Sequence, residues 1–239
     1  EKNAFTSWTS GGAETGNARA ASVEQANRGN YSGKFVFGGT AASNQAYQYI
    51  THSANQATHY SRLYVKVTSE SLATGEETSI FEQTTATLTA QVAGVKFVDV
   101  DGAGAYALKA YYHNGTSLTA YGTTQAISLN TWYAVELKYI SAAGAGGMNF
   151  YVDGVEVGAG VSSLSNASYP TRNFFVGQYN GTEDSALTYY LDDVAVDSAY
   201  RVYPVSTTVA GVTIDSGGAL TIGSLINTAY SYRHALISA

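Results

Sequence analysis

The chain has 239 residues, enough to bury a full core, and its hydrophobic fraction of 45% excludes disorder as the default state. Only 13% of the residues are charged, the formal net charge is −6 and the 12 Lys and Arg residues are scattered, which argues against a nucleic-acid partner. The absence of Cys removes disulfides, thiolate chemistry and Cys-ligated zinc, and no apolar run approaches the roughly 18 residues of a membrane helix.

The alternation of apolar and polar residues predicts β-strands along almost the whole chain. In residues 59–69 (HYSRLYVKVTS), Leu and Val at positions 63, 65 and 67 alternate with Tyr, Arg and Lys, so one face of this strand is buried and the other meets water. In chain order, further strands are predicted at residues 31–37, 46–51, 78–83, 94–100, 106–113, 132–140, 148–152, 173–179 and 187–196. About ten strands at short spacing predict an all-β fold, a two-sheet antiparallel β-sandwich.

Turn-forming residues separate these strands. The dipeptide Asp153-Gly154 lies between two alternating runs, which is a strong short-range signal for a β-hairpin. We interpret Asp153 as a turn residue rather than a ligand. The core is expected between the two sheets, with contributions from Trp132, Val135, Leu137, Phe150, Val152, Phe174, Val176, Val194 and Val196.

The character of the sequence changes after residue 204. Residues 205–239 carry few charges and many Gly, Ser and Thr, and the segments Val212–Ile214 and Leu220–Ile222 flank Gly217-Gly218, so a short hairpin is expected there. We therefore divide the chain into a β-sandwich over residues 1–204 and a C-terminal extension over residues 205–239. The extension is interpreted as a linker, or as a strand that pairs with another copy of the chain.

Three stretches carry a family resemblance. They are Glu1, Phe5 and Trp8 followed by Asn27–Phe35 (NRGNYSGKF); Asn130–Val157, with TWYAVELKY before MNFYVDGVEV; and Tyr189–Val196 (YYLDDVAV). In order and spacing they resemble the concanavalin A-like, laminin-G-like jelly-roll domains of bacterial carbohydrate-binding modules, over about residues 1–200. The resemblance implies a concanavalin A-like jelly roll at an extracellular, cell-surface or virion-surface location. It indicates the fold more than the ligand, since this fold carries several unrelated functions.

The resemblance also implies a structural Ca²⁺ ion. In members that carry calcium, an acidic residue near the N-terminus and an Asp on the closing strand hold one ion. The matching residues here are Glu1 and either Asp192 or Asp193. Carboxylates from the two ends of the domain and turn carbonyls would supply the several oxygens that Ca²⁺ requires. The alternative is that both Asp residues are ordinary charges at a strand end.

A polar and aromatic surface is the strongest candidate for a binding site. Its candidate residues face away from the core side of their own strands, and they are Tyr60, Arg62, Tyr64, Lys109, Tyr111, His113 and Gln178. Aromatic rings stack on sugars, and the polar groups between them reach sugar hydroxyls. These residues predict a non-catalytic module that recognises or adheres to a polysaccharide or surface glycan. The alternative is that Tyr is simply a favoured strand residue in a sequence of low charge.

Enzymatic functions have weaker support in the sequence. The Glu-x-Asp-x-x-Glu arrangement of glucanases is absent, as are the Gln-x-His and Arg-x-Glu-x-Arg patterns of alginate-lyase-like members. We therefore expect no enzyme, with a polysaccharide lyase as a distant third possibility. The second hypothesis, after the binding module, is that the protein is a structural subunit of an extracellular filament, sheath or viral particle that assembles through residues 205–239.

Overall fold

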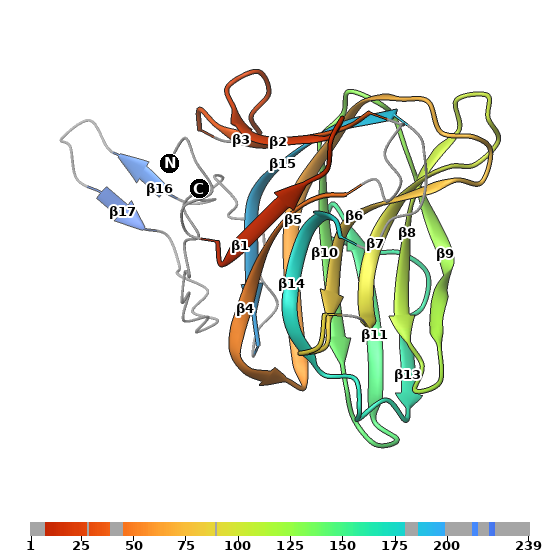
Figure 1. The fold of residues 1–239 in the computed structure, drawn as a ribbon. Helices are drawn as coiled ribbons and strands as arrows, with labels where there is room; N and C mark the ends of the chain where they lie inside the picture. Colours follow the sequence, from red (N-terminus) through yellow and green to blue (C-terminus); the bar gives the residue numbers. More distant parts are fainter. Residues whose placement is uncertain are drawn as a thin grey trace.

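A computed structural model describes residues 8–27, 29–38, 45–88, 90–179 and 186–198, and the backbone of residues 212–214 and 220–222. These residues form strands and turns but no helix, and so contain no helix that could span a membrane. Two large antiparallel sheets pack face to face (Figure 1), which confirms the predicted all-β sandwich.

The first sheet has seven strands in the order β1-β4-β14-β6-β7-β8-β9. In that order the strands are β1 (Ser10–Ala13), β4 (Ala46–Gln56), β14 (Thr171–Gln178), β6 (Glu77–Thr84), β7 (Gln91–Asp99), β8 (Tyr106–His113) and β9 (Leu118–Ile127). Strands β6 to β9 follow one another through short connections, as the turn residues between them predict.

The second sheet has eight strands, seven of them in the order β12-β11-β10-β5-β15-β3-β2, with β13 paired to β11. In the same order they are β12 (Val155–Glu156), β11 (Gly146–Val152), β10 (Tyr133–Ile140), β5 (Thr58–Glu70), β15 (Ala186–Asp197), β3 (Ser32–Gly38), β2 (Ala18–Ser22) and β13 (Val161–Leu164). Val152 lies opposite Val155, so the hairpin predicted at Asp153-Gly154 is present.

The C-terminal extension contains the predicted hairpin. Its strands β16 (Val212–Ile214) and β17 (Leu220–Ile222) pair with each other, and in the described part of the chain they join neither large sheet. The domain boundary at residue 204 and pairing of the extension with another copy of the chain stay predictions.

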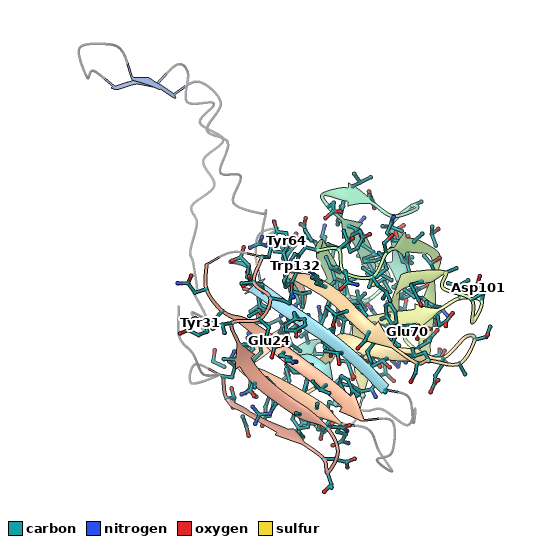
Figure 2. All side chains as sticks on the ribbon, turned by 90° about the horizontal axis from the view of Figure 1, so that it is seen from above. Glu24, Tyr31, Tyr64, Glu70, Asp101 and Trp132 are labelled. Carbon is teal, nitrogen blue, oxygen red and sulfur yellow. The ribbon has the colours of Figure 1, made fainter. Side chains whose placement is uncertain are left out.

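The core between the sheets is rich in phenylalanine. Val135, Leu137, Phe150, Val152, Phe174 and Val176 are buried there as predicted, and Val194 and Val196 are half-buried against it. The prediction that Trp132 contributes to the core is wrong, because its side chain is half-buried outside this core. It lies two residues before Ala134, which faces away from the core and pairs with Tyr64, and Figure 2 places Trp132 near Tyr64.

One pair of histidines links β4 and β5. His59 is fully buried, and its ring stacks on Phe174. Its Nε2 lies 3.0 Å from the Nε2 of His52. Burial, and then the neighbouring His52, lower the pKa of His59 to about 3. The ring is therefore neutral at pH 7, as a residue without access to water requires.

The outer face of the seven-stranded sheet carries one row of residues that crosses five strands. From β4 to β8, successive cross-strand partners are Tyr49, Phe175, Glu82, Gly94 and Tyr111. Neighbouring strands lie about 4.8 Å apart, so this cross-strand row extends over roughly 19 Å. Most residues adjacent to it in the chain pack into the core, so the row itself faces outward.

Candidate functional site

The structure divides the predicted binding residues between the two sheets. Tyr60, Arg62 and Tyr64 lie on β5 of the eight-stranded sheet, whereas Lys109 and Tyr111 lie on β8 of the seven-stranded sheet. Each group faces away from the core, so the two groups lie on opposite sides of the sandwich. They do not form the single Tyr-rich face that the sequence suggested, because alternation assigns a side of one strand but not the sheet that the strand joins.

Two further candidates are held inside the fold. The His113 ring lies on Tyr169, with ring centroids 3.4 Å apart, and its Nδ1 accepts a hydrogen bond of 3.1 Å from the Gly115 backbone N–H. Gln178 is buried, and its Oε1 accepts a hydrogen bond of 2.9 Å from the Ser79 backbone N–H. Both polar groups already serve the packing of the sheet.

The β5 group is compact. Arg62 is buried, and its Nη2 lies 3.3 Å from Asp193 Oδ2. Its guanidinium carbon is 5.6 Å from the Tyr64 ring centroid, and Lys138 Nζ is 5.8 Å from that of Tyr60. The charge of Arg62 is therefore compensated by a carboxylate on the neighbouring strand.

The aspartates proposed to hold calcium have other partners. Asp192 Oδ2 accepts a hydrogen bond of 2.8 Å from the Asn27 backbone N–H, and Asp193 faces the Arg62 guanidinium. A cation beside Asp193 would be repelled by that guanidinium, so the residues there do not fit Ca²⁺. Across the described residues, no three His, Asp or Glu side chains form a metal-binding group. Glu1 lies outside the described residues, so a site shared by Glu1 and Asp192 stays a prediction.

A charged cluster that the sequence did not reveal lies beside the cross-strand row. It consists of Glu77 on β6, Lys96 on β7, and Lys109 and Tyr111 on β8, and we call it the Glu77 cluster. Glu77 Oε1 accepts hydrogen bonds of 2.7 Å from Lys109 Nζ and 2.6 Å from the Tyr111 phenol. Lys96 Nζ lies 3.7 Å from Glu77 Oε2. Two ammonium groups thus share one carboxylate.

The electrostatics of the Glu77 cluster favour an anion. Burial alone would raise the pKa of Glu77, but the hydrogen bonds from Lys109 and Tyr111 lower it below its ordinary value. Burial, with the hydrogen bond to Glu77, raises the pKa of Tyr111 to about 12, so the phenol keeps its proton at pH 7. Lys96 Nζ and Lys109 Nζ lie 5.1 and 5.2 Å from the Tyr111 ring centroid. The cluster therefore carries one excess positive charge around a protonated phenol.

Sequence reasoning found Lys109 and Tyr111 but missed Glu77 and Lys96. The missing information is strand pairing: Lys96 lies directly opposite Lys109, and the β6–β7 register shifts between Ser79 and Phe81. The sequence offered one signal for Glu77 and Lys96: both are charged residues in or directly beside predicted strands of a chain that has few charges.

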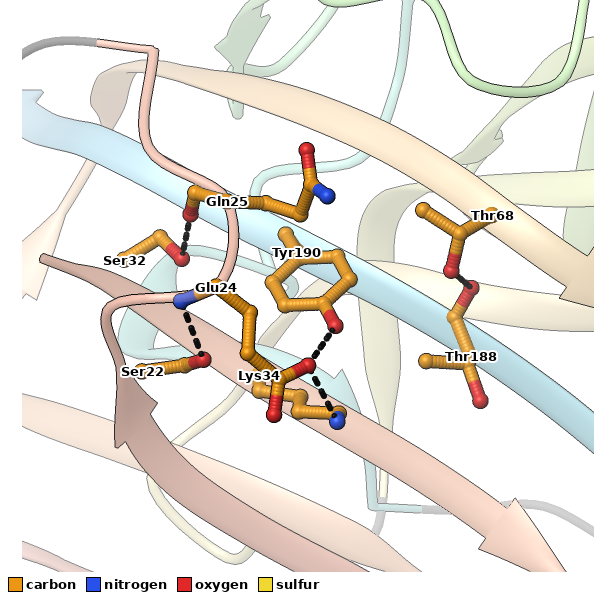
Figure 3. A network of polar contacts seen from close by, with 8 residues as sticks. All are labelled: Ser22, Glu24, Gln25, Ser32, Lys34, Thr68, Thr188 and Tyr190. Atoms are coloured by element: carbon orange, nitrogen blue, oxygen red, sulfur yellow. Dashed lines mark hydrogen bonds and ion pairs between the residues drawn. The ribbon is translucent and has the colours of Figure 1, made fainter.

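A similar group of residue types lies on the eight-stranded sheet (Figure 3). Lys34 Nζ and the Tyr190 phenol donate hydrogen bonds of 2.7 and 2.6 Å to Glu24 Oε2, and Lys34 Nζ lies 5.6 Å from the Tyr190 ring centroid. We call these three residues the Glu24 cluster. One lysine here balances one carboxylate, and the Glu24 side chain is 57% exposed.

Two antiparallel sheets with a charged and aromatic outer face define a jelly-roll sandwich of the lectin and glucanase kind. The chain belongs to the concanavalin A-like lectin/glucanases superfamily, whose family model matches residues 45–201. This confirms the predicted resemblance. No curated protein matches the chain by sequence.

Solved structures with the same fold include two lyases. An endo-β-1,4-glucuronan lyase from the fungus Trichoderma reesei has a TM-score of 0.61 at 10% identity, covering 82% of this chain and 93% of that one. The cellulose induced protein Cip1 has a TM-score of 0.60 at 14% identity, covering 80% and 89%. An alginate lyase from Klebsiella pneumoniae has a TM-score of 0.55 at 7% identity, covering 75% and 84%. At these identities the likeness shows the fold.

These comparisons overturn two predictions. The chain was expected to be a non-catalytic binding module or a structural subunit, and not an enzyme, whereas the similar solved structures are mostly polysaccharide lyases. The prediction failed because it required linear motifs. The Glu77 cluster gathers acidic, basic and phenolic groups from three strands, which no motif within one strand can reveal.

Proposed function

We propose that the protein is a polysaccharide lyase that cleaves an acidic polysaccharide by β-elimination at the Glu77 cluster. The observation that carries this proposal is the contact of one phenol and two lysines with one half-buried carboxylate. β-Elimination next to a carboxylate needs a positive charge that neutralises the carboxylate, a base for the proton at C5, and an acid for the departing oxygen at C4. The cluster holds a group for each role.

Lys96 is suited to bind the substrate carboxylate. Its ammonium is 3.7 Å from Glu77 and is not tied to it by a short hydrogen bond, unlike that of Lys109. A carboxylate bound to Lys96 would partly neutralise this lysine, and the proton affinity of Glu77 would then rise. Substrate binding itself would thus prepare Glu77 to accept a proton.

Tyr111 and Lys109 would carry the proton transfers. The Tyr111 oxygen takes the C5 proton while its own proton passes to Glu77 along the existing hydrogen bond. The electron pair of the C5–H bond forms the C4=C5 double bond, and the C4–O4 bond breaks. Lys109, which loses its charged partner when Glu77 is protonated, donates a proton to O4. No water is consumed, and one product ends in an unsaturated uronate.

The proposed substrate is a polymer of uronic acids. The excess positive charge of the cluster supports an acidic chain over a neutral one. The names of two similar structures, a glucuronan lyase and an alginate lyase, point to the same chemical class. Because such polymers are met outside cells, we place the activity in the extracellular space or at the cell surface.

The proposal is tested with the full chain and a panel of polysaccharides. Glucuronan, polymannuronate and polyguluronate serve as acidic substrates, and unmodified cellulose serves as the neutral control. We expect the ultraviolet absorbance of the new conjugated double bond to appear with at least one acidic polymer and not with cellulose. An absence of this absorbance from all three acidic polymers, at high enzyme concentration, would contradict the proposal.

A further inference from the structure

Four aromatic rings lie together at the β4 end of the cross-strand row. Phe175 is fully buried, and its ring stacks on Tyr49 and on Tyr179, with centroid distances of 4.8 and 4.6 Å. Tyr47 meets Tyr179 edge-on at 4.8 Å. Phe175 is thus the base of the group, and we call Tyr47, Tyr49 and Tyr179 the tyrosine triad. The β14 backbone reaches Tyr179 through Gly177, whose φ of +86° favours glycine.

The phenols of the tyrosine triad are not bonded within the described part of the fold. In the described part of the chain, none of the three phenol oxygens takes part in a hydrogen bond, and all three side chains are half-buried. By contrast, the described tyrosines whose phenols form hydrogen bonds include Tyr106, Tyr111, Tyr121, Tyr133, Tyr139, Tyr189 and Tyr190. Three adjacent phenols thus have no hydrogen-bond partner among the described residues and are available to a ligand there.

Arg19 reaches β4 from β2 of the other sheet, on the core side of β4 rather than on the side of Tyr47 and Tyr49. Arg19 Nε donates a hydrogen bond of 3.2 Å to the Gly12 carbonyl, and its guanidinium also contacts Gln48. Burial raises the pKa of Tyr47, the phenols of Tyr179 and Tyr49 add to the rise, and Arg19 opposes it. The phenols consequently stay protonated and can act as hydrogen-bond donors.

The triad and the Glu77 cluster lie at the two ends of one continuous row. Phe175 and Tyr111 are three strand spacings apart, roughly 14 Å. Between them Glu82 is buried, and a Cβ at Gly94 would come within 2.8 Å of Gln91 Nε2. An extended oligosaccharide is long enough to contact both ends at once, whereas a disaccharide at the Glu77 cluster could not reach the triad.

We propose that the tyrosine triad is a second subsite for the acidic polysaccharide, which binds across the strands with one uronate at the Glu77 cluster and another at the triad. This inference rests on the proposed function for the identity of the ligand. Phenol hydroxyls donate to the carboxylate and hydroxyl oxygens of the distant sugar. The protein is then specific for chains several sugars long.

The test is calorimetric binding of uronate disaccharides and hexasaccharides to the full chain carrying Tyr111→Phe, in which cleavage is expected to be lost. Into this background the three changes Tyr47→Phe, Tyr49→Phe and Tyr179→Phe are introduced together, which removes the hydroxyls and keeps the rings. We expect hexasaccharide binding to weaken by about 10-fold or more, as three lost hydrogen bonds imply, with disaccharide binding unchanged. Tyr190→Phe on the opposite sheet is the matched control and should change neither.

The outcomes separate the subsite from the activity. Equal hexasaccharide affinity with and without the triad hydroxyls, in variants whose melting temperatures match, overturns the subsite, and so does the absence of any hexasaccharide binding. A hexasaccharide that binds through the triad supports the subsite even if the unmodified chain cleaves no polymer. In that case the proposed lyase function fails while the binding surface stands.

Discussion

The two faces of the sandwich carry clusters built from the same residue types. In the Glu24 cluster and in the Glu77 cluster, a tyrosine donates to the carboxylate at 2.6 Å and a lysine donates at 2.7 Å. The short contacts alone do not distinguish them. A glutamate bonded to a lysine and a tyrosine is therefore not by itself evidence of a site.

Burial and charge balance do distinguish the two clusters. The side chain of Glu24 is 57% exposed and has one lysine, whereas that of Glu77 is 16% exposed and has two. Exposed ion pairs are screened by water and contribute little. A shielded carboxylate with an excess of positive charge can bind an anion and exchange protons with a neighbouring phenol. Under the proposed function, chemistry is therefore expected at Glu77 and a surface role at Glu24.

The largest expected difference between the clusters is in turnover. Lys109→Met removes the proposed proton donor, and we expect kcat on an acidic polymer to fall by roughly 100-fold, the lower range for loss of a general acid. Lys34→Met removes the corresponding lysine from the exposed cluster and should leave kcat unchanged. Steady-state ultraviolet assays compare the two variants with the unmodified chain, and equal effects would break the distinction.

A smaller effect is expected from the second lysine of the Glu77 cluster. Lys96→Met removes the charge proposed to bind the substrate carboxylate, so KM should rise by roughly 10-fold, as expected for one charge-assisted hydrogen bond. The rise should shrink at high salt, because salt screens the attraction in the unmodified chain. A fall in kcat with no change in KM would instead assign Lys96 to the chemical step.

The fold should weaken in acid before Glu77 titrates. The pKa of His59 is about 3 in the folded chain against 6.5 for an ordinary histidine. As the pH falls, this histidine therefore binds a proton in the unfolded chain before it does so in the folded chain. The contribution of His59 to the free energy of unfolding is fully present above about pH 6.5 and is lost progressively towards pH 3. Between pH 7 and pH 5 the free energy of unfolding should fall by about 2 kcal/mol through His59.

Urea denaturation at several pH values measures this decline. In His59→Phe, which keeps a ring against Phe174, the decline should be smaller by a similar amount, and an unchanged decline would show that His59 is not its source. Glu77, whose pKa is lowered, stays ionised over the same range. A loss of activity between pH 7 and pH 5 that exceeds the loss of folded protein would therefore point to a group outside the Glu77 carboxylate.

The sequence predicted single strands and hairpins better than their assembly. Alternation located β5, β8 and β10, and Asp153-Gly154 located a hairpin, because both signals act over a few residues. Trp132 was predicted to lie in the core. It lies just before β10 and is on the side of the sheet that faces away from the core. Placing a residue relative to the core requires the strand boundary to be known within one residue, since one step changes the face.

The candidate site was predictable only in part, for the same reason. Lys109 and Tyr111 share one strand, so their common side follows from alternation. Their partners Glu77 and Lys96 come from strands whose register depends on a bulge. Tyr64 was grouped with Tyr111 although their strands belong to different sheets. Strand order is set by the packing of the whole domain, which no local pattern contains.

The most direct test of the Glu77 cluster as a catalytic centre is a paired measurement on Tyr111→Phe and Tyr190→Phe. Each change removes one hydroxyl that is bonded to a glutamate beside a lysine, one on each sheet. With matched melting temperatures, nuclear magnetic resonance of the reaction on an acidic polymer measures the olefinic proton of the unsaturated product. We predict that Tyr111→Phe forms this product at least about 100-fold more slowly than the unmodified chain, while Tyr190→Phe forms it at the same rate. Equal rates for the two variants would contradict the assignment of β-elimination to the Glu77 cluster.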